Sequence, residues 1–421
     1  MPWLSLVDAP FIHLHNNPQR SEMEKQSGIR ASDLSKAAAW KFIILVGVVS
    51  LFSDMTYEGA RSVTGPFLGI LNASATIVGI VAGLGEFIGY ALRLVSGYVT
   101  DRLGKYWSIT FVGYALNLFA VPLLALVGDW ELAALLIIME RMGKAIRTPA
   151  RDAMLSHATT EVGRGWGFGF HEAMDQIGAM LGPLIVATVL YFNGSYRAGF
   201  AYLLIPAILA VLIITIAARL YPHPQRLEVS APKLETKGLT HPYWLYVVAV
   251  GLIGAGYADF PLIAYHFGKA AVAPPNWIPI LYAVAMGVDA VAALILGRLF
   301  DRLGIPVIMA VSILSALFAP LVFLGGFNLA LLGMVLWGIG MGAQESIIKA
   351  ALAEMVPRDR RATGYGIFNT GFGLFWFLGS ALMGILYDVS LWSLIFFSVI
   401  IQLCSLPIFF KISKEMRFMT R

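Results

Sequence analysis

The stretch GYVTDRLGKYW (residues 97–107) places an Asp-Arg pair and a lysine between two long apolar segments. A second stretch, GRLFDRLGIPV, begins at residue 297 and repeats the pattern Gly-x-x-x-Asp-Arg-x-Gly. The two aspartates, Asp101 and Asp301, are 200 residues apart. A repeat over such a distance predicts that the chain contains two copies of one structural unit.

A longer alignment supports this duplication. The stretch ERMGKAIRTPARDAMLSHATTEVGRGWGFGF (140–170) aligns with WGIGMGAQESIIKAALAEMVPRDRRATGYGI (337–367) at a shift of 197 residues. The alignment pairs Gly143 with Gly340, Gly167 with Gly364, and Gly169 with Gly366. Because each copy holds about six apolar segments, we expect two six-helix units in parallel orientation, which is a plan of membrane transporters.

The composition places these segments in a bilayer. The chain is 58% hydrophobic and 13% charged, with a mean hydropathy of +0.75, which exceeds the apolar share of soluble domains. Segments of about 20 apolar residues, long enough to cross hydrocarbon, recur after residue 40. They lack the alternation of barrel strands, so the fold class is an all-α membrane protein with twelve helices in two pseudo-symmetric bundles. The predicted spans are 40–63, 74–100, 105–127, 130–156, 163–192, 196–220, 243–267, 275–299, 305–326, 328–355, 361–387 and 390–412.

The basic residues predict how the chain is oriented. Lys and Arg concentrate before residue 42 and in alternate connections, so both termini are expected to be cytoplasmic. The net charge of +5 then needs no nucleic-acid partner, and the single Cys404 cannot form an intrachain disulfide. We expect a multi-pass protein of a prokaryotic cytoplasmic membrane. Its predicted parts are a tail (1–39), a first bundle (40–220), a cytoplasmic linker (221–242), a second bundle (243–413) and a short tail (414–421).

The first Asp-Arg box resembles the signature of the major facilitator superfamily, G-x-x-x-D-R-x-G-R/K in the loop between helices 2 and 3. Its matching residues are Gly97, Asp101, Arg102, Gly104 and Lys105, and those of the second copy are Gly297, Asp301, Arg302 and Gly304. The resemblance covers about 370 residues and implies two bundles around a central cavity. The second copy departs from the pattern at Ile305 and Pro306.

These boxes are suited to a cytoplasmic gate. A carboxylate can accept hydrogen bonds from the start of a neighbouring helix, and the basic residues can pair with acids across the seam between the bundles. Glycines permit close approach and tight turns. The alternative is that these charges only set the topology of the loops; two copies in register favour the gate.

Charged residues inside the predicted spans indicate a transport site, because such residues are costly in a bilayer and face a partner or a wet cavity. Asp54, Glu58 and Arg61 share one stripe of the first helix, and helix 4 has charges from Glu140 to Asp152 on one face. The predicted proton-coupling residues are Asp54, Glu58, Glu86, Glu172 and Asp175. The predicted substrate or charge-network residues are Arg141, Lys144, His171, Asp259, Asp289 and Glu345.

A carboxylate beside a cation can load and release a proton when the pairing changes with conformation. The same residues could instead be structural ion pairs that hold helices 1, 2, 4 and 5 together. The second half has fewer such charges. We therefore expect the first half to carry the coupling and the second half to complete the cavity, with aromatic side chains such as Trp337, Phe372 and Trp376 as possible lining or core.

Helix 5 contains GFHEAMDQIGAMLGP, in which Gly169, Gly178, Gly182 and Pro183 keep the spacing of a signature typical of proton-linked exporters of the same superfamily. Val186 and Ala187 replace the closing glycine pair of that signature. The resemblance implies antiport. The alternative is that the glycines only allow close helix packing.

Enzyme classes find no support, because the sequence has no H-E-x-x-H motif and no Walker lysine motif. We expect no cofactor and no metal. The sequence predicts a monomeric secondary transporter in the lipid bilayer that exports a small organic molecule in exchange for protons. The alternative is a proton-coupled uptake symporter for an organic anion, favoured by Arg141 and Lys144. A sensor without transport activity is the least favoured reading.

Overall fold

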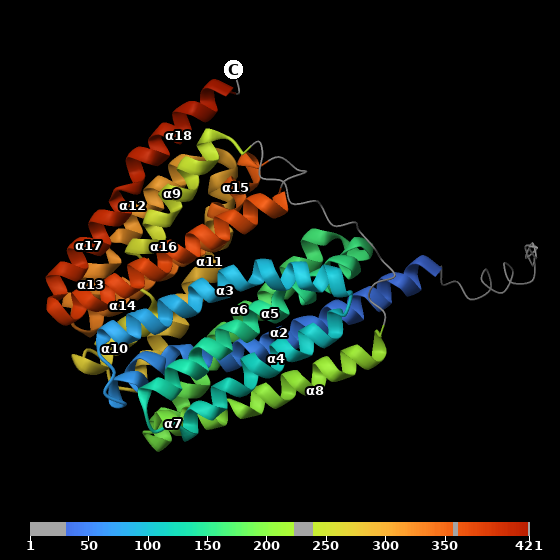
Figure 1. The fold of residues 1–421 in the computed structure, drawn as a ribbon, viewed down its shortest axis with the longest axis horizontal. Helices are drawn as coiled ribbons and strands as arrows, with labels where there is room; N and C mark the ends of the chain where they lie inside the picture. Colours follow the sequence, from blue (N-terminus) through green and yellow to red (C-terminus); the bar gives the residue numbers. More distant parts are fainter. Residues whose placement is uncertain (1–30, 223–238, 357–360, 420–421) are drawn as a thin grey trace, which may run out of the picture.

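The computed structural model describes residues 31–222, 239–356 and 361–419 (Figure 1). Most of the predicted N-terminal tail and of the linker at 221–242 therefore lies outside the described residues, as does the end of the C-terminal tail. The secondary structure of the described residues is helical. This agrees with the predicted all-α class.

The first half consists of the following helices: α2 (Ala31–Ile70), α3 (Ala75–Leu103), α4 (Tyr106–Leu123) with the short η1 (Leu124–Leu126), α5 (Trp130–Val162), α6 (Arg164–Asn193), α7 (Tyr196–Tyr202) and α8 (Leu204–Leu220). The second half consists of α9 (His241–Gly256), α10 (Phe260–Lys269), α11 (Trp277–Leu303), α12 (Ile305–Ala316), α13 (Phe318–Leu324), α14 (Phe327–Glu345), α15 (Ile347–Met355), α16 (Arg361–Val389), α17 (Leu391–Leu403) and α18 (Ser405–Met419). Short breaks divide several predicted spans into two helices.

Eleven of the described segments are long and apolar enough to cross a membrane. The predicted span at 130–156 is not among them, although α5 is 33 residues long. Its charged residues, from Glu140 to Asp152, explain the difference. Together with α5 the count is twelve, which confirms the predicted fold class.

The predicted helix at 243–267 is interrupted. α9 ends at Gly256 and α10 begins at Phe260. The carbonyl of Gly256 accepts hydrogen bonds from Ser398 Oγ (2.6 Å) and Gln402 Nε2 (3.1 Å). Backbone can leave the helix at membrane depth where neighbouring side chains satisfy the freed groups. The break places Asp259 ahead of α10 with only 1% of its surface exposed.

The two halves lie against each other along α3 and α16 and along α2 and α10 (Figure 1). We call the side where α2 begins and α8 ends the linker side, and the other the far side. On the far side, a methyl group on Gly65 would overlap the carbonyl oxygen of Pro261, and one on Gly79 would overlap that of Ser380. The halves are therefore closed there by backbone contact.

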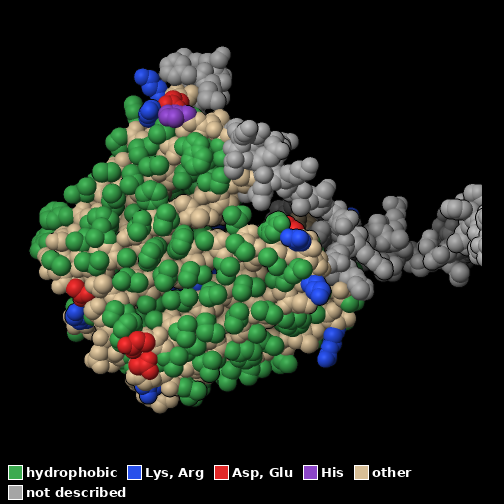
Figure 2. All heavy atoms as spheres, in the orientation of Figure 1, with side chains coloured by type: hydrophobic (Ala, Val, Ile, Leu, Met, Phe, Trp, Pro, Cys, Tyr) green, Lys and Arg blue, Asp and Glu red, His purple; other side chains and the backbone are tan. Residues whose placement is uncertain are grey.

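Hydrophobic side chains cover the middle of the face shown in Figure 2, and its Lys, Arg, Asp and Glu side chains lie at the edges. The outward-facing apolar residues include Leu126 and Phe192, each 81% exposed. This distribution suits a surface in contact with lipid. The charged residues of the predicted spans must then be sought in the interior.

Candidate functional site

A buried arginine connects the two halves. Arg61 in α2 places Nη2 2.8 Å from Oδ1 of Asp259 in the second half and 3.0 Å from Oε1 of Glu86 in α3. Its Nη1 is 3.9 Å from Oε1 of Glu58, one turn earlier in α2. Trp376 Nε1 donates to the other oxygen of Asp259 at 3.3 Å. One guanidinium thus holds carboxylates from three separate chain segments.

The network continues into α5. Arg141 Nη2 lies 3.4 Å from Oε1 of Glu86, and its Nε lies 3.3 Å from Oε2 of Glu140. Asn117 in α4 donates Nδ2–H to Oε1 of Glu140 at 2.7 Å. Glu86 therefore lies between two arginines, one of which also contacts the second half.

Glu58 forms a second connection between the halves. Tyr282 in α11 donates its hydroxyl to Oε2 of Glu58 at 2.6 Å. Lys144 Nζ lies 4.0 Å from Oε1 of the same carboxylate and donates to the Tyr57 hydroxyl at 2.7 Å. These contacts place five of the predicted residues in one group: Glu58, Glu86, Arg141, Lys144 and Asp259.

A cavity of about 340 Å³ lies between the halves on the linker side of this network. Its volume is in the range of small-molecule sites. The cavity is lined from α2, α3, α5, α14, α15 and α16. The charged lining residues are Glu58, Arg61, Glu86, Arg93, Arg141, Lys144, Glu345 and Lys349.

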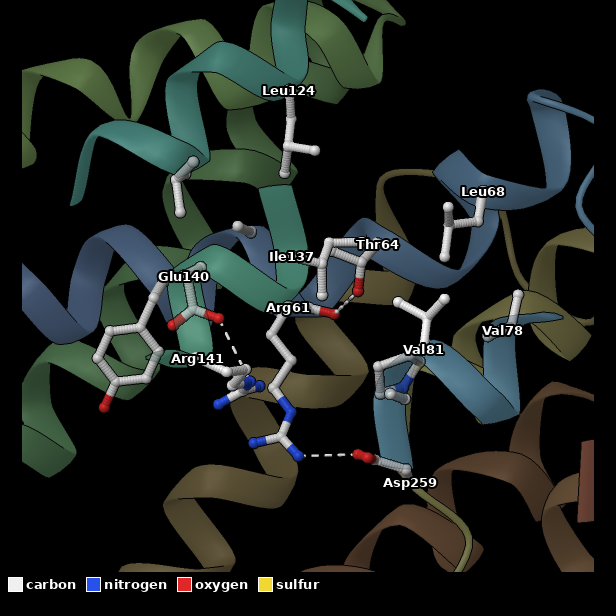
Figure 3. Close-up of a pocket in the computed structure, with 15 residues that line it drawn as sticks. Arg61, Thr64, Leu68, Val78, Val81, Leu124, Ile137, Glu140, Arg141 and Asp259 are labelled. Carbon is white, nitrogen blue, oxygen red and sulfur yellow. Dashed lines mark hydrogen bonds and ion pairs between the residues drawn. The ribbon is translucent and has the colours of Figure 1, made fainter. Parts of the chain in front are cut away.

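Figure 3 shows the far side of the network, where Arg61 points toward Asp259 and Arg141 toward Arg61. The space there is a hollow of about 20 Å³, lined mainly by apolar residues such as Leu68, Val78 and Leu124. It has room for no more than about one water molecule. The charged network therefore lies between a closed apolar side and the larger cavity.

A second polar group lies nearer the linker side, inside the first half. Arg151 Nη1 donates to Ser50 Oγ at 3.1 Å, and Ser50 Oγ lies 2.8 Å from Nε2 of His171. Because Ser50 Oγ accepts from the arginine, its hydroxyl hydrogen is available for Nε2. Nδ1 of His171 then carries the ring hydrogen and faces Oδ2 of Asp175 at 3.4 Å. Asp175, His171 and Ser50 form a continuous chain of polar groups.

Asp54 lies beside this chain. Arg147 Nη2 is 3.9 Å from its Oδ1, and the Arg147 guanidinium carbon lies 4.5 Å from the centre of the Tyr114 ring. Arg147 has only 1% of its surface exposed. Asp54 thus has a buried arginine as its neighbour.

The remaining predicted acids do not join these ion pairs. Glu172 is exposed, and within the described chain it forms no ion pair. Glu345 accepts a hydrogen bond from Gln176 Nε2 at 3.4 Å across the halves. Asp289 is buried, and its Oδ1 has no hydrogen-bond partner in the described part of the chain.

The two Asp-Arg boxes end α3 and α11. Gly104 and Gly304 have φ angles of 62° and 67°, and their amides donate to the carbonyls of Thr100 (2.9 Å) and Phe300 (2.7 Å). Glycine is favoured at positive φ, which explains its place in both boxes. Among the described residues, no ion pair involves Asp101, Arg102, Lys105, Asp301 or Arg302. A Cβ added to Gly97 would lie 3.6 Å from the Cβ of Pro149, and one added to Gly297 would have no atom within 4 Å.

Two glycines of the helix-5 motif form a close contact. A methyl group on Gly178 would overlap the Leu51 carbonyl, and one on Gly182 would overlap the Met55 carbonyl, both in α2. Gly169 has nothing within 4 Å, and Pro183 lies within α6. The motif residues Gly178 and Gly182 thus bring α6 against the helix that carries Asp54.

Several residues of this site were not predicted from the sequence. Arg61 was visible as part of the charged stripe with Asp54 and Glu58, so its position could have indicated a partner for them. Asn117 and Tyr282 lie in otherwise apolar segments. A lone polar side chain in such a segment gives no sign of which helix it faces.

Comparison with known proteins agrees with the helical fold described above. The profile described as Major Facilitator Superfamily matches residues 45–343 and 243–414. An uncharacterized protein of Mycobacterium tuberculosis is 38% identical over 382 residues, which are 89% of this chain and 93% of the relative. An uncharacterized MFS-type transporter of Methanocaldococcus jannaschii is 28% identical over 366 residues, covering 83% of this chain and 89% of the relative.

Two solved structures share the fold. The bacterial homolog to the human lysosomal transporter Spinster, inward-facing and unoccupied, has a TM-score of 0.72 at 14% identity, covering 90% of this chain and 97% of its own. The nucleoside transporter NupG has a TM-score of 0.66 at 14% identity, covering 89% and 98%. At this identity the likeness shows the architecture alone.

Proposed function

The chain belongs to the major facilitator superfamily and is a multi-pass membrane transporter, and we propose that it exports a small organic molecule in exchange for protons. In this proposal the halves rock about the central cavity. The linker side faces the cytoplasm, since the segment 221–242 and the helix ends beside it are rich in Lys and Arg. In this proposal a single chain contains the whole transport path and works as a monomer.

The observation that carries the proposal is the contact of Arg61 with Asp259, Glu86 and Glu58 at the end of the cavity. The contact to Asp259 joins the halves and must lengthen when the far side opens. The arginine then keeps its partners in α2 and α3 only. A change of ion-pair partners between conformations is the means by which a buried carboxylate can gain or lose a proton.

Proton transfer is assigned to the group formed by Asp54, Asp175 and His171. Asp175 has one oxygen beside the His171 ring and a second, Oδ1, that is buried without a hydrogen-bond partner among the described residues. Helix α6 carries both residues and packs on α2 through Gly178 and Gly182. Movement of α6 relative to α2 would therefore change the surroundings of the carboxylate directly. Glu172, exposed two turns before Gly178, is the second coupling candidate on this helix.

Uptake of an organic anion together with protons is the second candidate. It is favoured by the cations Arg93, Arg141, Lys144 and Lys349 in the cavity lining. In both candidates the Asp-Arg boxes act as the cytoplasmic gate. They form no ion pair with other described residues in this conformation, in which the cavity lies toward the linker side.

The test uses membrane vesicles of both orientations with a dye that reports an imposed proton gradient. A panel of small organic acids, amines and neutral amides is added in turn. An exporter discharges the gradient in inverted vesicles when a transported compound is added, and a symporter moves protons inward with the compound in right-side-out vesicles. No compound-dependent proton movement in either orientation would contradict the proposal.

Two variants test the coupling residues in the same assay. Asp175→Asn and Glu172→Gln are expected to abolish proton movement, because neither amide can exchange a proton. Glu131→Gln is the matched control, since Glu131 is exposed near the far-side end of α5. Undiminished proton-linked flux in both Asp175→Asn and Glu172→Gln would refute the assignment to α6.

A further inference from the structure

Two cations that line the cavity form no ion pair with other described residues. Arg93 in α3 and Lys349 in α15 both line it, and neither has a carboxylate oxygen within ion-pair distance among the described residues. The guanidinium carbon of Arg93 lies 5.4 Å from the centre of the Tyr90 ring. Its Nε is buried and has no hydrogen-bond partner in the described chain. A buried donor without a partner is costly and indicates that a ligand group completes the site.

The other charges of the cavity are already engaged. Glu86 contacts Arg61 and Arg141, and Glu58 accepts from Tyr282 and lies near Arg61 and Lys144. Glu345 accepts from Gln176. Each acid of the cavity therefore has a cation or a hydrogen-bond donor of the described chain beside it. Among the described residues, Arg93 and the exposed Lys349 have no carboxylate within ion-pair distance. The lining therefore has cations available to bind a negatively charged group of a ligand.

The wall beside these cations is aromatic. Phe368, Phe372 and Trp376 follow one another along α16 at intervals of four residues, with ring centres 6.0 Å and 5.5 Å apart. Tyr90 meets Phe372 edge to face at 5.6 Å. Each of the three α16 rings is largely buried, and their remaining exposed parts give this side of the cavity an apolar surface. A ligand that fills this wall has a flat or apolar body.

We propose that the cavity binds an organic anion that has an aromatic ring, with its carboxylate or phosphate between Arg93 and Lys349 and its ring against the aromatic residues of α16. This assignment rests on the proposed transport function and specifies its substrate class. Because Arg93 and Lys349 belong to different halves, the bound anion attracts both halves toward itself on the linker side. Substrate binding then favours closure of that side.

Binding is tested by thermal shift with the purified full-length chain in detergent, because a ligand of the native state raises the apparent stability. The probes share one ring and differ in charge: benzoate, phenyl phosphate, benzamide and benzylammonium. We expect one of the two anions to bind about tenfold or more tightly than benzamide, as one charge-assisted hydrogen bond provides. Benzylammonium is expected to bind most weakly.

The variants Arg93→Gln and Lys349→Gln are each expected to weaken anion binding about tenfold and to leave benzamide binding unchanged. Arg219→Gln and Lys414→Gln are the matched controls, since both cations are exposed at the ends of α8 and α18. Anion binding at the wild-type level in both cavity variants would overturn the proposal. So would equal binding of benzamide, preferred binding of benzylammonium, or no binding of either anion.

The binding measurement needs no proton gradient, so its result does not depend on whether the proposed proton coupling is correct. A wild-type chain that binds anions but moves no protons in vesicles would contradict the proposed coupling and support the site. A chain that moves protons with amides or amines and binds neither anion would support transport and overturn the site.

Discussion

The two halves follow the same order of helices but fill their interiors with different side chains. In the first half, α5 contributes Glu140, Arg141 and Lys144 to the charged network. At the shift of 197 residues, the second half has Trp337, Gly338 and Met341 at these places. An ion pair can exchange partners without a large loss of contact, whereas a packed ring cannot. The comparison suggests that the first half holds the changing contacts and the second half is the rigid support.

The interior of the second half contains a group of buried rings, two of which, Trp337 and Tyr257, donate hydrogen bonds to backbone carbonyls. Trp337 is fully buried, contacts the rings of Tyr257, Phe260 and Tyr282, and donates Nε1–H to the Ala258 carbonyl at 2.9 Å. Tyr257 donates to the carbonyl of Trp337. This packing surrounds the break before α10 and fixes the position from which Asp259 reaches Arg61.

The largest effect is expected where the two kinds of interior meet, at Arg61. Arg61→Met leaves Glu58, Glu86 and Asp259 without their common partner, and breaking a buried ion pair costs about 3 to 5 kcal/mol. We expect flux per folded molecule to fall about a hundredfold or more in proteoliposomes, as two orders of magnitude correspond to about 2.7 kcal/mol. Arg219→Met, at an exposed site, is the control.

Arg61→Lys keeps the charge and supplies a folded variant should the methionine variant be unstable. A lysine cannot contact two carboxylates with a planar fork, so its flux should lie between those of the wild type and Arg61→Met. Wild-type flux in either variant would show that the central ion pairs are not part of the working cycle. This result would contradict the proposal that the first half holds the changing contacts and the second half is the rigid support.

Smaller effects, on different quantities, are expected at Trp337 and its aligned residue Glu140. Substitution of Trp337 should mainly lower stability, and substitution of Glu140 should mainly lower flux. Trp337→Ala should lower the free energy of unfolding by about 3 to 5 kcal/mol, since it empties a packed site. Glu140→Gln keeps the oxygen that accepts from Asn117 and leaves Arg141 paired with Glu86, so it should cost less stability than Trp337→Ala, yet reduce flux. Trp392→Ala is the matched tryptophan control, because Trp392 is 56% exposed on the outer surface.

Thermal denaturation and flux, measured on the same preparations, decide between these expectations. If Glu140→Gln loses as much stability as Trp337→Ala, both interiors are structural to the same degree. If Trp337→Ala keeps its stability and loses flux, the aromatic group takes part in the conformational change itself.

The helices could be predicted from the sequence because each needs only its own apolar length and backbone hydrogen bonds. α5 was predicted even though its charges exclude it from the purely apolar segments. The break between α9 and α10 was missed, because the Gly256 carbonyl accepts hydrogen bonds from Ser398 and Gln402, in a segment about 140 residues further along the chain. Hydrogen bonds from such a distant segment cannot be recognised in the sequence around the break.

The site could be predicted as a set of residue types but not as a set of pairs. Helical periodicity placed Glu58 and Arg61 on one stripe, and bilayer energetics marked Glu58 as a candidate functional residue. The partner of Arg61 is 198 residues away, and Tyr282 is 224 residues from Glu58. Which helices lie side by side depends on the packing of both halves, and a single sequence does not specify it.

The smallest effect is expected at Asp388, which is a charge of the second half acting on the first. Its oxygens accept hydrogen bonds from the backbone amides of Ala75 (3.3 Å) and Thr76 (2.8 Å), so it caps α3 across the interface on the far side. Asp129 caps α5 within the first half by accepting from the amide of Leu132 at 2.8 Å. The two caps have the same chemistry, but only one joins the halves.

Loss of a cap costs about 1 kcal/mol, which is about a fivefold change in an equilibrium. Asp388→Ala should therefore shift the molecule toward opening of the far side, with faster hydrogen exchange at the start of α3 and a change in flux of up to about fivefold. Asp129→Ala should speed exchange at the start of α5 and leave flux unchanged, because it weakens a contact that both conformations retain. Equal effects on flux would mean that the cap of α3 contributes only to helix stability, and the far-side closure would then depend on the glycine contacts alone.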